Sequence, residues 1–255
     1  MTKLTDKTDK RKEALQRAKS QLREEASRDQ LVIKAVKMLD EASGNFQDEF
    51  ERFKDWYSIY FPELMEELSE DEHVMKILDK GLKREEVKGF ESMAEESTGK
   101  ALKDEDLEVL QNSFDMLQNK HELMQELEDY VETAMKEDAS NISTLLGPLL
   151  AARLMSLAGG LEELAKKPAS TVQMLGAEKA LFRYLRGNGT PPKHGIVFEH
   201  EYVNTLPEDK RGKMARFLAN KAVMAARVDQ YSDKEKGEEY REKAREKYEE
   251  LKEEE

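Results

Sequence analysis

Cysteine is absent from the 255-residue chain, which excludes disulfides and metal sites built on thiolates. No apolar run approaches the ~18 residues that a membrane-spanning helix needs. The first residues, MTKLTDKTDKRKEALQRAK, are charged and lack the apolar segment of a secretory signal. We therefore expect a soluble, intracellular protein with no membrane partner.

Motifs of catalysis and cofactor binding are also lacking. The chain has no HExxH sequence, no nucleophile–His–carboxylate arrangement and no glycine-rich phosphate loop. Gly176–Lys179 resembles half a P-loop but lacks its leading glycine and the following Ser/Thr. His194 and His200 flank a predicted loop without a good third ligand. The sequence therefore predicts a protein that is not an enzyme and holds neither metal nor cofactor.

Charged residues, in contrast, are abundant. They make up 38% of the chain, well above the roughly 25% of an average globular domain, and the hydrophobic fraction is also 38%. Such a balance suits long, thin helices better than one large round core. The length allows one or two domains.

The charge is unevenly distributed. The whole chain carries −13, but residues 166–231 hold 12 basic and six acidic residues, a net +6 that leaves −19 elsewhere. A basic segment in an acidic chain points to a polyanionic partner. A solvated basic surface without a partner is an equally good interpretation of the charge alone.

Hydrophobic spacing predicts helices through most of the chain. Segments near 29–57, 71–97, 103–136, 169–186 and 207–229 have helical periodicity or caps. We expect four parts: a charged N-terminal helix or tail (1–27), a helical coiled-coil stalk (28–140), a compact helical domain (141–231) and a charged C-terminal tail (232–255), either a solvated helix or disordered.

One seam in the stalk has 3-4-3-4 spacing, as in an antiparallel coiled-coil hairpin. It consists of Leu107, Leu110, Phe114, Leu117, His121 and Met124. A lone histidine in such a seam is far more often a polar register residue than a metal ligand.

Several strings are distinctive as a set. They are PASTVQML from Pro168, GAEKALFR from Gly176, PPKHGIVF from Pro191, RGKMAR from Arg211 and AARVD from Ala225. In this order they resemble the Nop domain of box C/D ribonucleoprotein scaffold proteins, archaeal and nucleolar relatives of a spliceosomal pre-mRNA-processing factor. The resemblance covers roughly residues 28–231, and GAEKALFR is nearer to the box C/D branch.

The resemblance implies an all-α fold, with a long antiparallel coiled-coil stalk that mediates homodimerisation and a compact C-terminal helical Nop domain. It implies a non-catalytic scaffold for RNA-guided RNA modification or processing. Its partners would be a kink-turn RNA, such as a box C/D guide RNA, and a small kink-turn-binding protein like a ribosomal protein. The expected location is the cytoplasm of an archaeon or the nucleolus or nucleus of a eukaryote.

The resemblance also assigns residues, with the seam above as the dimerisation surface. The expected RNA contacts are Gly176, Ala177, Glu178, Lys179, Arg183, Lys193, His194, Lys213, Arg216, Lys221 and Arg227. Leu218 and Ala222 are expected to meet the partner protein. Core positions for Leu181 and Phe182, and a local Arg227–Asp229 ion pair, are the simpler interpretations there.

The chain departs from the family pattern in two respects. It begins at the helix after the α/β domain with which family members dock the methyltransferase fibrillarin, so fibrillarin binding is not expected. Glu199 stands at a usually neutral position, where a carboxylate disfavours phosphate. Two alternatives remain: a coiled-coil interaction adaptor that has lost RNA binding, and a spliceosomal-like RNA-processing factor.

Overall fold

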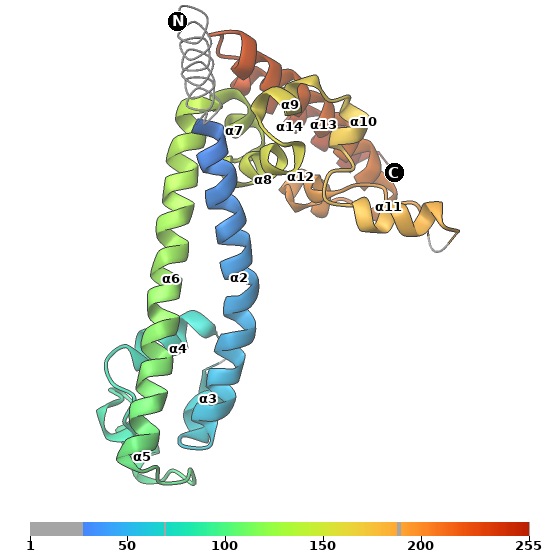
Figure 1. Ribbon diagram of the computed structural model, residues 1–255. Coiled ribbons are helices and arrows are strands. Elements are labelled where there is room, and N and C mark those ends of the chain that lie inside the picture. Colours follow the sequence, from blue (N-terminus) through green and yellow to red (C-terminus); the bar gives the residue numbers. More distant parts are fainter. Residues whose placement is uncertain (1–27, 69, 188–189, 255) are drawn as a thin grey trace, which may run out of the picture. The chain divides into compact units, whose positions relative to one another are not determined.

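A computed structural model describes residues 28–68, 70–187 and 190–254, so the predicted N-terminal segment 1–27 lies outside the described residues. The described chain consists of helices and connecting loops without a β-strand (Figure 1), which confirms the predicted all-α fold. The elements are α2 (Arg28–Ser58), α3 (Pro62–Glu67), α4 (Asp71–Leu78), η1 (Arg84–Glu86), α5 (Glu91–Glu95), α6 (Asp104–Asp138), α7 (Ser140–Leu146), α8 (Pro148–Ala158), α9 (Leu161–Lys166), α10 (Ala169–Val172), α11 (Glu178–Leu185), η2 (Ile196–Glu199), α12 (Glu201–Asn204), α13 (Glu208–Tyr231) and α14 (Gly237–Glu253).

The helices form two compact units. Of the described residues, those at 28–37 and from 128 onward belong to unit 1, and those between 38 and 127 belong to unit 2. Both long helices, α2 and α6, contribute residues to each unit. The division therefore does not coincide with the boundary that the sequence placed at residue 140.

Unit 2 is built on an antiparallel pair of helices, α2 and α6 (Figure 1). The Phe53 ring lies 5.4 Å from that of Phe114, and the Phe46 ring lies 5.8 Å from that of His121. Because partners fall along one helix as they rise along the other, the two run in opposite directions. Aromatic rings at three- and four-residue steps along α2 thus form the core between the two helices.

The connection between α2 and α6 contains less helix than predicted. In place of one helix over 71–97, the chain forms α4, η1 and α5. Gly81 and Gly89 have φ of 146° and 89°, which end the helical path between these elements. The Tyr57 hydroxyl donates to the Leu82 carbonyl at 2.8 Å and fastens this connection to α2.

In unit 1, a buried polar network joins the start of α7 to the end of α13. Asn141, 2% exposed, donates its amide Nδ2 to Asp229 Oδ1 at 2.7 Å. The Asp229 carboxylate also accepts the backbone N–H groups of Asn141 and Ile142, both at 2.9 Å. The Asn141 side-chain oxygen accepts two backbone N–H groups from the start of α14, including that of Gly237 at 2.7 Å. Asp229 therefore caps α7 and does not pair with Arg227.

Helix α14 corrects the prediction for residues 232–255. The solvated helix or disordered tail expected there is wrong, because α14 packs into the core of unit 1. Tyr240, Ala244 and Leu251 are buried at 5%, 0% and 0% exposure. Their spacing of four and seven residues places them on one face of the helix, hidden in the sequence among many charges.

Among the described residues, no single helix combines the length and the apolar character needed to cross a bilayer; only α7 and α8 taken together do, and they are bent by 116°.

Candidate nucleic-acid interface

Gln173, at the end of α10, joins the segment before α11 to the PPKHG loop. Its backbone carbonyl accepts the Gly195 N–H at 2.7 Å, and its side-chain Nε2 donates to the Lys193 carbonyl at 2.7 Å. The next residue of the loop, Ile196, donates its N–H to the Leu175 carbonyl at 2.7 Å. These bonds hold the residues directly before GAEK against PPKHG, although residues 180–190 separate the two strings in the chain.

The turn before α11 uses its own polar groups. Gly176 has φ of +84°, and its N–H donates to Glu178 Oε1 at 3.0 Å. Ala177 is 9% exposed, and its N–H donates to the Met174 carbonyl at 3.0 Å. Because the N–H groups of Gly176 and Ala177 are already bonded, Gly176, Ala177 and Glu178 shape the turn, and the first two offer no free N–H donor to a phosphate.

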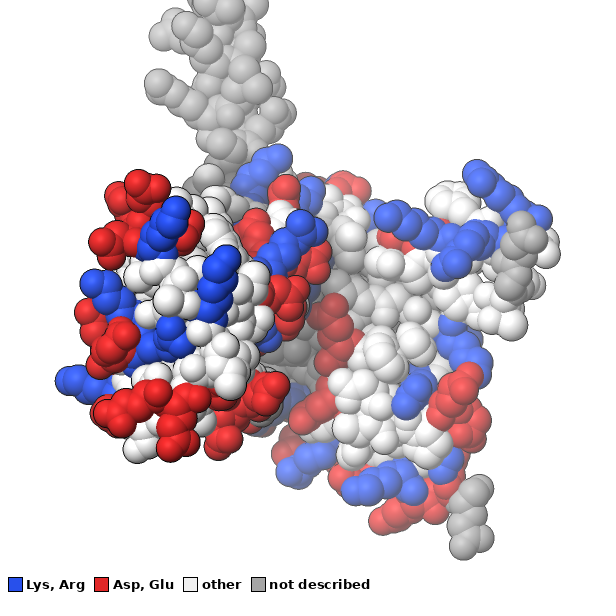
Figure 2. Space-filling model, turned by 90° about the horizontal axis from the view of Figure 1, so that it is seen from below, with Lys and Arg blue, Asp and Glu red and all other residues white. Residues whose placement is uncertain are grey.

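Helix α11 has no buried residue and extends as an arm from unit 1 (Figure 1). Lys179 and Arg183 lie on it with exposed side chains, and no hydrogen bond or ion pair joins either to another residue of the described ranges. Phe182 shares their face within an arc of about 100° and is 58% exposed. The core position predicted for Phe182 is therefore wrong. Figure 2 shows Lys and Arg side chains gathered on this arm with little acidic surface between them.

The PPKHG loop carries the next two predicted contacts. Lys193 Nζ lies 3.2 Å from Glu208 Oε1 in an exposed ion pair. The His194 ring stacks on that of Phe198 with centroids 4.6 Å apart. Burial and the nearby Arg211 guanidinium lower the pKa of His194, so the ring is neutral at pH 7. His194 thus offers a flat ring and one N–H donor without charge.

Arg211 is a residue that the sequence did not single out. Its guanidinium lies 5.4 Å from the centroid of the Phe198 ring, next to His194, while its Nε donates to the Leu206 carbonyl at 2.7 Å. Only its place within the RGKMAR string marked it beforehand. Nearby, Glu199 Oε2 pairs with Arg153 Nη1 at 2.9 Å, which neutralises the carboxylate expected to disfavour phosphate.

The four cations predicted on α13 have different environments. Arg216 is exposed and has no hydrogen bond or ion pair to another described residue. Lys213 Nζ lies 3.0 Å from Glu254 Oε2, and the Lys221 ammonium lies over the Phe217 ring at 5.3 Å. Arg227 Nε donates to the Ala165 carbonyl at 2.8 Å and so joins α13 to α9. Arg216 is therefore the least engaged of these four.

The structure corrects the predicted partner-protein contacts on α13. Leu218 and Ala222 are both 0% exposed and belong to the core of unit 1. Side chains with no exposed surface cannot meet another protein. Their apolar spacing instead reflects packing against the chain's own helices.

The predicted dimerisation seam of unit 2 has the same explanation. Leu110, Phe114 and Leu117 are 0–1% exposed in the core of this chain, so they have no surface to offer to a second copy. Leu107 and Met124 pack against the same core and are partly buried. The seam is therefore closed within the chain by α2 and the connection that follows it.

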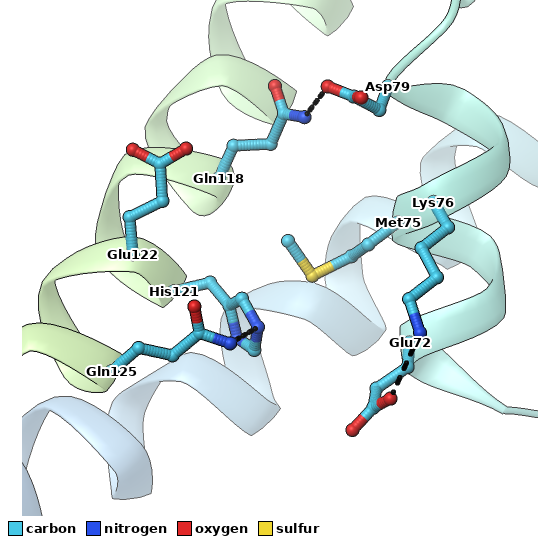
Figure 3. A pocket seen from close by; sticks show the side chains of 8 residues that line it. All are labelled: Glu72, Met75, Lys76, Asp79, Gln118, His121, Glu122 and Gln125. Carbon is cyan, nitrogen blue, oxygen red and sulfur yellow. Dashed lines mark hydrogen bonds and ion pairs between the residues drawn. The ribbon is translucent and has the colours of Figure 1, made fainter. Parts of the chain in front are cut away.

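His121, the polar member of the seam, lies at a shallow hollow of about 330 Å³ between α4 and α6 (Figure 3). Its ring Nε2 is 3.1 Å from Gln125 Nε2, and across the hollow Gln118 donates to Asp79 at 2.6 Å. Among the described residues, no group of three or more His, Asp or Glu side chains could hold a metal ion.

A different face of α6 is exposed and apolar. Val109, Met116 and Leu123 are 51%, 52% and 37% exposed. They recur at intervals of seven residues, the repeat of a coiled-coil contact position. Unit 2 therefore presents a second apolar stripe beside its closed seam.

Together, these features define an all-helical protein with an outward basic helix, the class suited to polyanion recognition. A family model described as "Nop: snoRNA binding domain, fibrillarin" matches residues 38–250, and the chain belongs to the Nop family.

Several known proteins resemble the chain. It is 39% identical over 220 residues to an uncharacterized NOP5 family protein of Methanocaldococcus jannaschii, covering 81% of this chain and 53% of that protein. It is 35% identical to nucleolar protein 58 of Aspergillus terreus (79% of this chain, 37% of that protein). Identity to nucleolar protein 56 of Caenorhabditis elegans is 33% (80% and 46%). The chain thus spans about half the length of these relatives or less.

A solved structure has the same fold. A chain from a crystal structure of a fibrillarin/NOP5P complex aligns with a TM-score of 0.58 at 28% identity, covering 94% of this chain and 77% of that one. Fibrillarin is thus a component of the complex that contains this structural relative. The expectation that the present chain does not bind fibrillarin stays a prediction, as does its location in the cell.

Proposed function

We propose that this chain is a non-catalytic scaffold of a box C/D-type ribonucleoprotein, which binds kink-turn RNA together with a small kink-turn-binding protein. The observation that carries the proposal is α11, a helix with no buried residue that presents Lys179, Phe182 and Arg183 on one face. Relatives named as nucleolar proteins, and a family model described as snoRNA-binding, support the RNA partner.

The chemistry of α11 suits RNA. Lysine and arginine side chains bind phosphates, and an exposed aromatic ring stacks on an unpaired or terminal base. The PPKHG loop adds Lys193 and His194 beside the α11 turn, and α13 adds Arg216. A net charge of +6 on residues 166–231 supports a few phosphate contacts, which by themselves give little sequence readout. Joint binding with a second protein would supply the missing affinity and selectivity.

A gel-shift titration tests the proposal with a box C/D kink-turn RNA, with and without the kink-turn-binding protein. At low salt, we expect a supershift when that protein is present, and a far weaker shift or none when it is absent. Lys179→Glu together with Arg183→Glu should weaken binding at least about tenfold, because two phosphate contacts become repulsive. Lys83→Glu with Lys88→Glu, which reverses two exposed cations of unit 2, is the matched control.

The adaptor alternative gives the opposite result. A chain that has lost RNA binding would show no supershift at low salt, and reversal of Lys179 and Arg183 would change nothing. That outcome would refute the scaffold proposal.

Self-association is a second part of the proposal. We infer that two copies pair through the stripe of Val109, Met116 and Leu123, since the seam predicted for this role is closed within the chain. Light scattering after size exclusion should give twice the chain mass for the wild type and the chain mass for Met116→Glu. Met38→Glu, at an equally exposed methionine of α2, is the control.

A further inference from the structure

The carboxyl end of α14 lies on the part of α13 that carries predicted RNA contacts. Lys213 Nζ is 3.0 Å from Glu254 Oε2, and the Lys210 ammonium donates to the Glu254 backbone carbonyl. Residues 210 and 213 are neighbours on one helical face. Glu254, directly after α14, therefore occupies two cations at once.

The rest of α14 is held independently of this contact. Tyr240 and Leu251 are buried, and the Tyr248 hydroxyl lies 3.1 Å from that of Thr205. In contrast, the Lys213 and Glu254 side chains are 60% and 41% exposed. The ion pair can therefore open while the helix stays in place.

The Glu254 carboxylate on the Lys213 ammonium makes the same charge-assisted contact that a phosphate oxygen makes, while the Glu254 backbone carbonyl takes a hydrogen bond from Lys210. The hydrogen bond and charge of Glu254 raise the pKa of Lys213, and Lys213 in turn lowers the pKa of Glu254. Both shifts mean that each group favours the charged form of the other. Elsewhere on the proposed RNA surface, Lys179, Arg183 and Arg216 have no such partner among the described residues.

We propose that Glu254 is an intramolecular competitor of RNA phosphate for Lys210 and Lys213, so that the end of α14 lowers RNA affinity until a phosphate displaces it. This inference rests on the proposed RNA-binding function. Phosphate binding at α13 exchanges one ion pair for another and leaves a free carboxylate beside the RNA. Removing the Glu254 charge should therefore strengthen binding.

The expected size follows from the exposure of the pair. An exposed ion pair changes an equilibrium by roughly two- to fivefold, and salt screens it. Glu254→Gln should raise RNA affinity by about that factor at low ionic strength, and the gain should shrink as salt is added.

The experiment uses the full chain with kink-turn RNA and the kink-turn-binding protein, and compares four variants. Glu254→Gln is measured against Glu249→Gln, which removes one exposed negative charge of α14 that has no partner in the described residues. Lys213→Ala is measured alone and combined with Glu254→Gln. Circular dichroism checks that each variant keeps its helices.

The inference requires three results together. Glu254→Gln must gain more affinity than Glu249→Gln, Lys213→Ala must lose affinity, and the excess gain must disappear in the Lys213→Ala background. Equal gains for the two glutamine variants, or no loss for Lys213→Ala, would overturn the inference but leave the proposed function standing. Failure of the wild type to bind RNA beside the kink-turn protein would overturn both.

Discussion

Gly195 lies so close to the segment before α11 that one added methyl group should push the PPKHG loop away from it. A Cβ added to Gly195 would lie 1.9 Å from the Leu175 carbonyl oxygen, 2.8 Å from its carbon and 2.9 Å from the Met174 carbonyl carbon. Contacts below 3.0 Å are essentially never made by a Cβ atom. In Gly195→Ala the PPKHG loop must therefore retreat from the segment before α11 by about 1 Å.

That movement breaks the hydrogen bonds that hold the loop. The Gly195 and Ile196 N–H groups each donate to a backbone carbonyl at a distance of 2.7 Å. A retreat of about 1 Å takes both hydrogen bonds beyond bonding range. Each lost bond costs about 1 kcal/mol, and more where a partner is left buried. We expect the free energy of unfolding to fall by about 2–4 kcal/mol, and RNA affinity to fall because Lys193 and His194 are displaced.

Urea unfolding followed by circular dichroism measures the first effect, and gel shift the second. Gly212→Ala is the control. Gly212 lies inside α13, and a Cβ added there would meet only Lys193 Cβ, at 3.7 Å. There the change should stabilise by about 0.5–1 kcal/mol, as for alanine in a helix interior. A Gly195→Ala variant as stable as the wild type would refute the packing argument.

Three further predictions concern other parts of the chain. Asn141→Ala removes the centre of a buried network and should cost about 3–5 kcal/mol by chemical unfolding; a loss below about 1 kcal/mol would contradict the network. Hydrogen bonds from Ser97 and Thr98 lower the pKa of Glu63 to about 2, so its stabilisation is present above the unfolded-state pKa and is lost as pH falls toward 2. In a pH series Glu63→Gln should be less stable than the wild type at pH 7, and the difference should shrink under acid. Phe182→Ala should leave stability nearly unchanged but weaken RNA binding by about 1–3 kcal/mol if the ring stacks on a base, and equal affinity would rule that contact out.

The long helices could be predicted closely because their apolar period extends over many turns. The helix expected at Pro207–Asp229 is α13, Glu208–Tyr231, and the long helix expected near 103–136 is α6, Asp104–Asp138. The expected helix over 169–186 is instead interrupted between α10 and α11, where Gly176 takes φ of +84°. A single glycine in a helical pattern does not reveal whether it uses that freedom.

Burial was harder to predict than helix formation. The apolar spacing of Leu110, Phe114 and Leu117 indicated a seam, but spacing does not say whether the chain itself or another copy covers it. Leu218 and Ala222 were assigned to a partner for the same reason, and the chain covers both. Phe182 was expected inside and is 58% exposed. In each case the deciding neighbours are far away in the sequence.

The sequence motifs of the candidate site could be predicted, but their arrangement in space could not. GAEK and PPKHG were recognised separately, whereas the bonds from Gln173 that place them together follow only from the fold. The engagement of Lys213 by Glu254 could not be foreseen either, since the segment that contains Glu254 was expected to be solvated or disordered. Lys179 and Arg183 remain predictions with the accessible, unpaired side chains that the hypothesis requires.

The absence of buried residues in α11 has a genetic consequence. Substitutions in this helix should escape cellular quality control, because they leave the core intact and the protein accumulates normally. If two copies pair through the stripe on α6 as proposed, such a variant would still join wild-type copies. In a cell that makes both versions of the chain, mixed assemblies would then carry one defective arm, so mutations in α11 should act dominantly over the wild type, while mutations in the core should not.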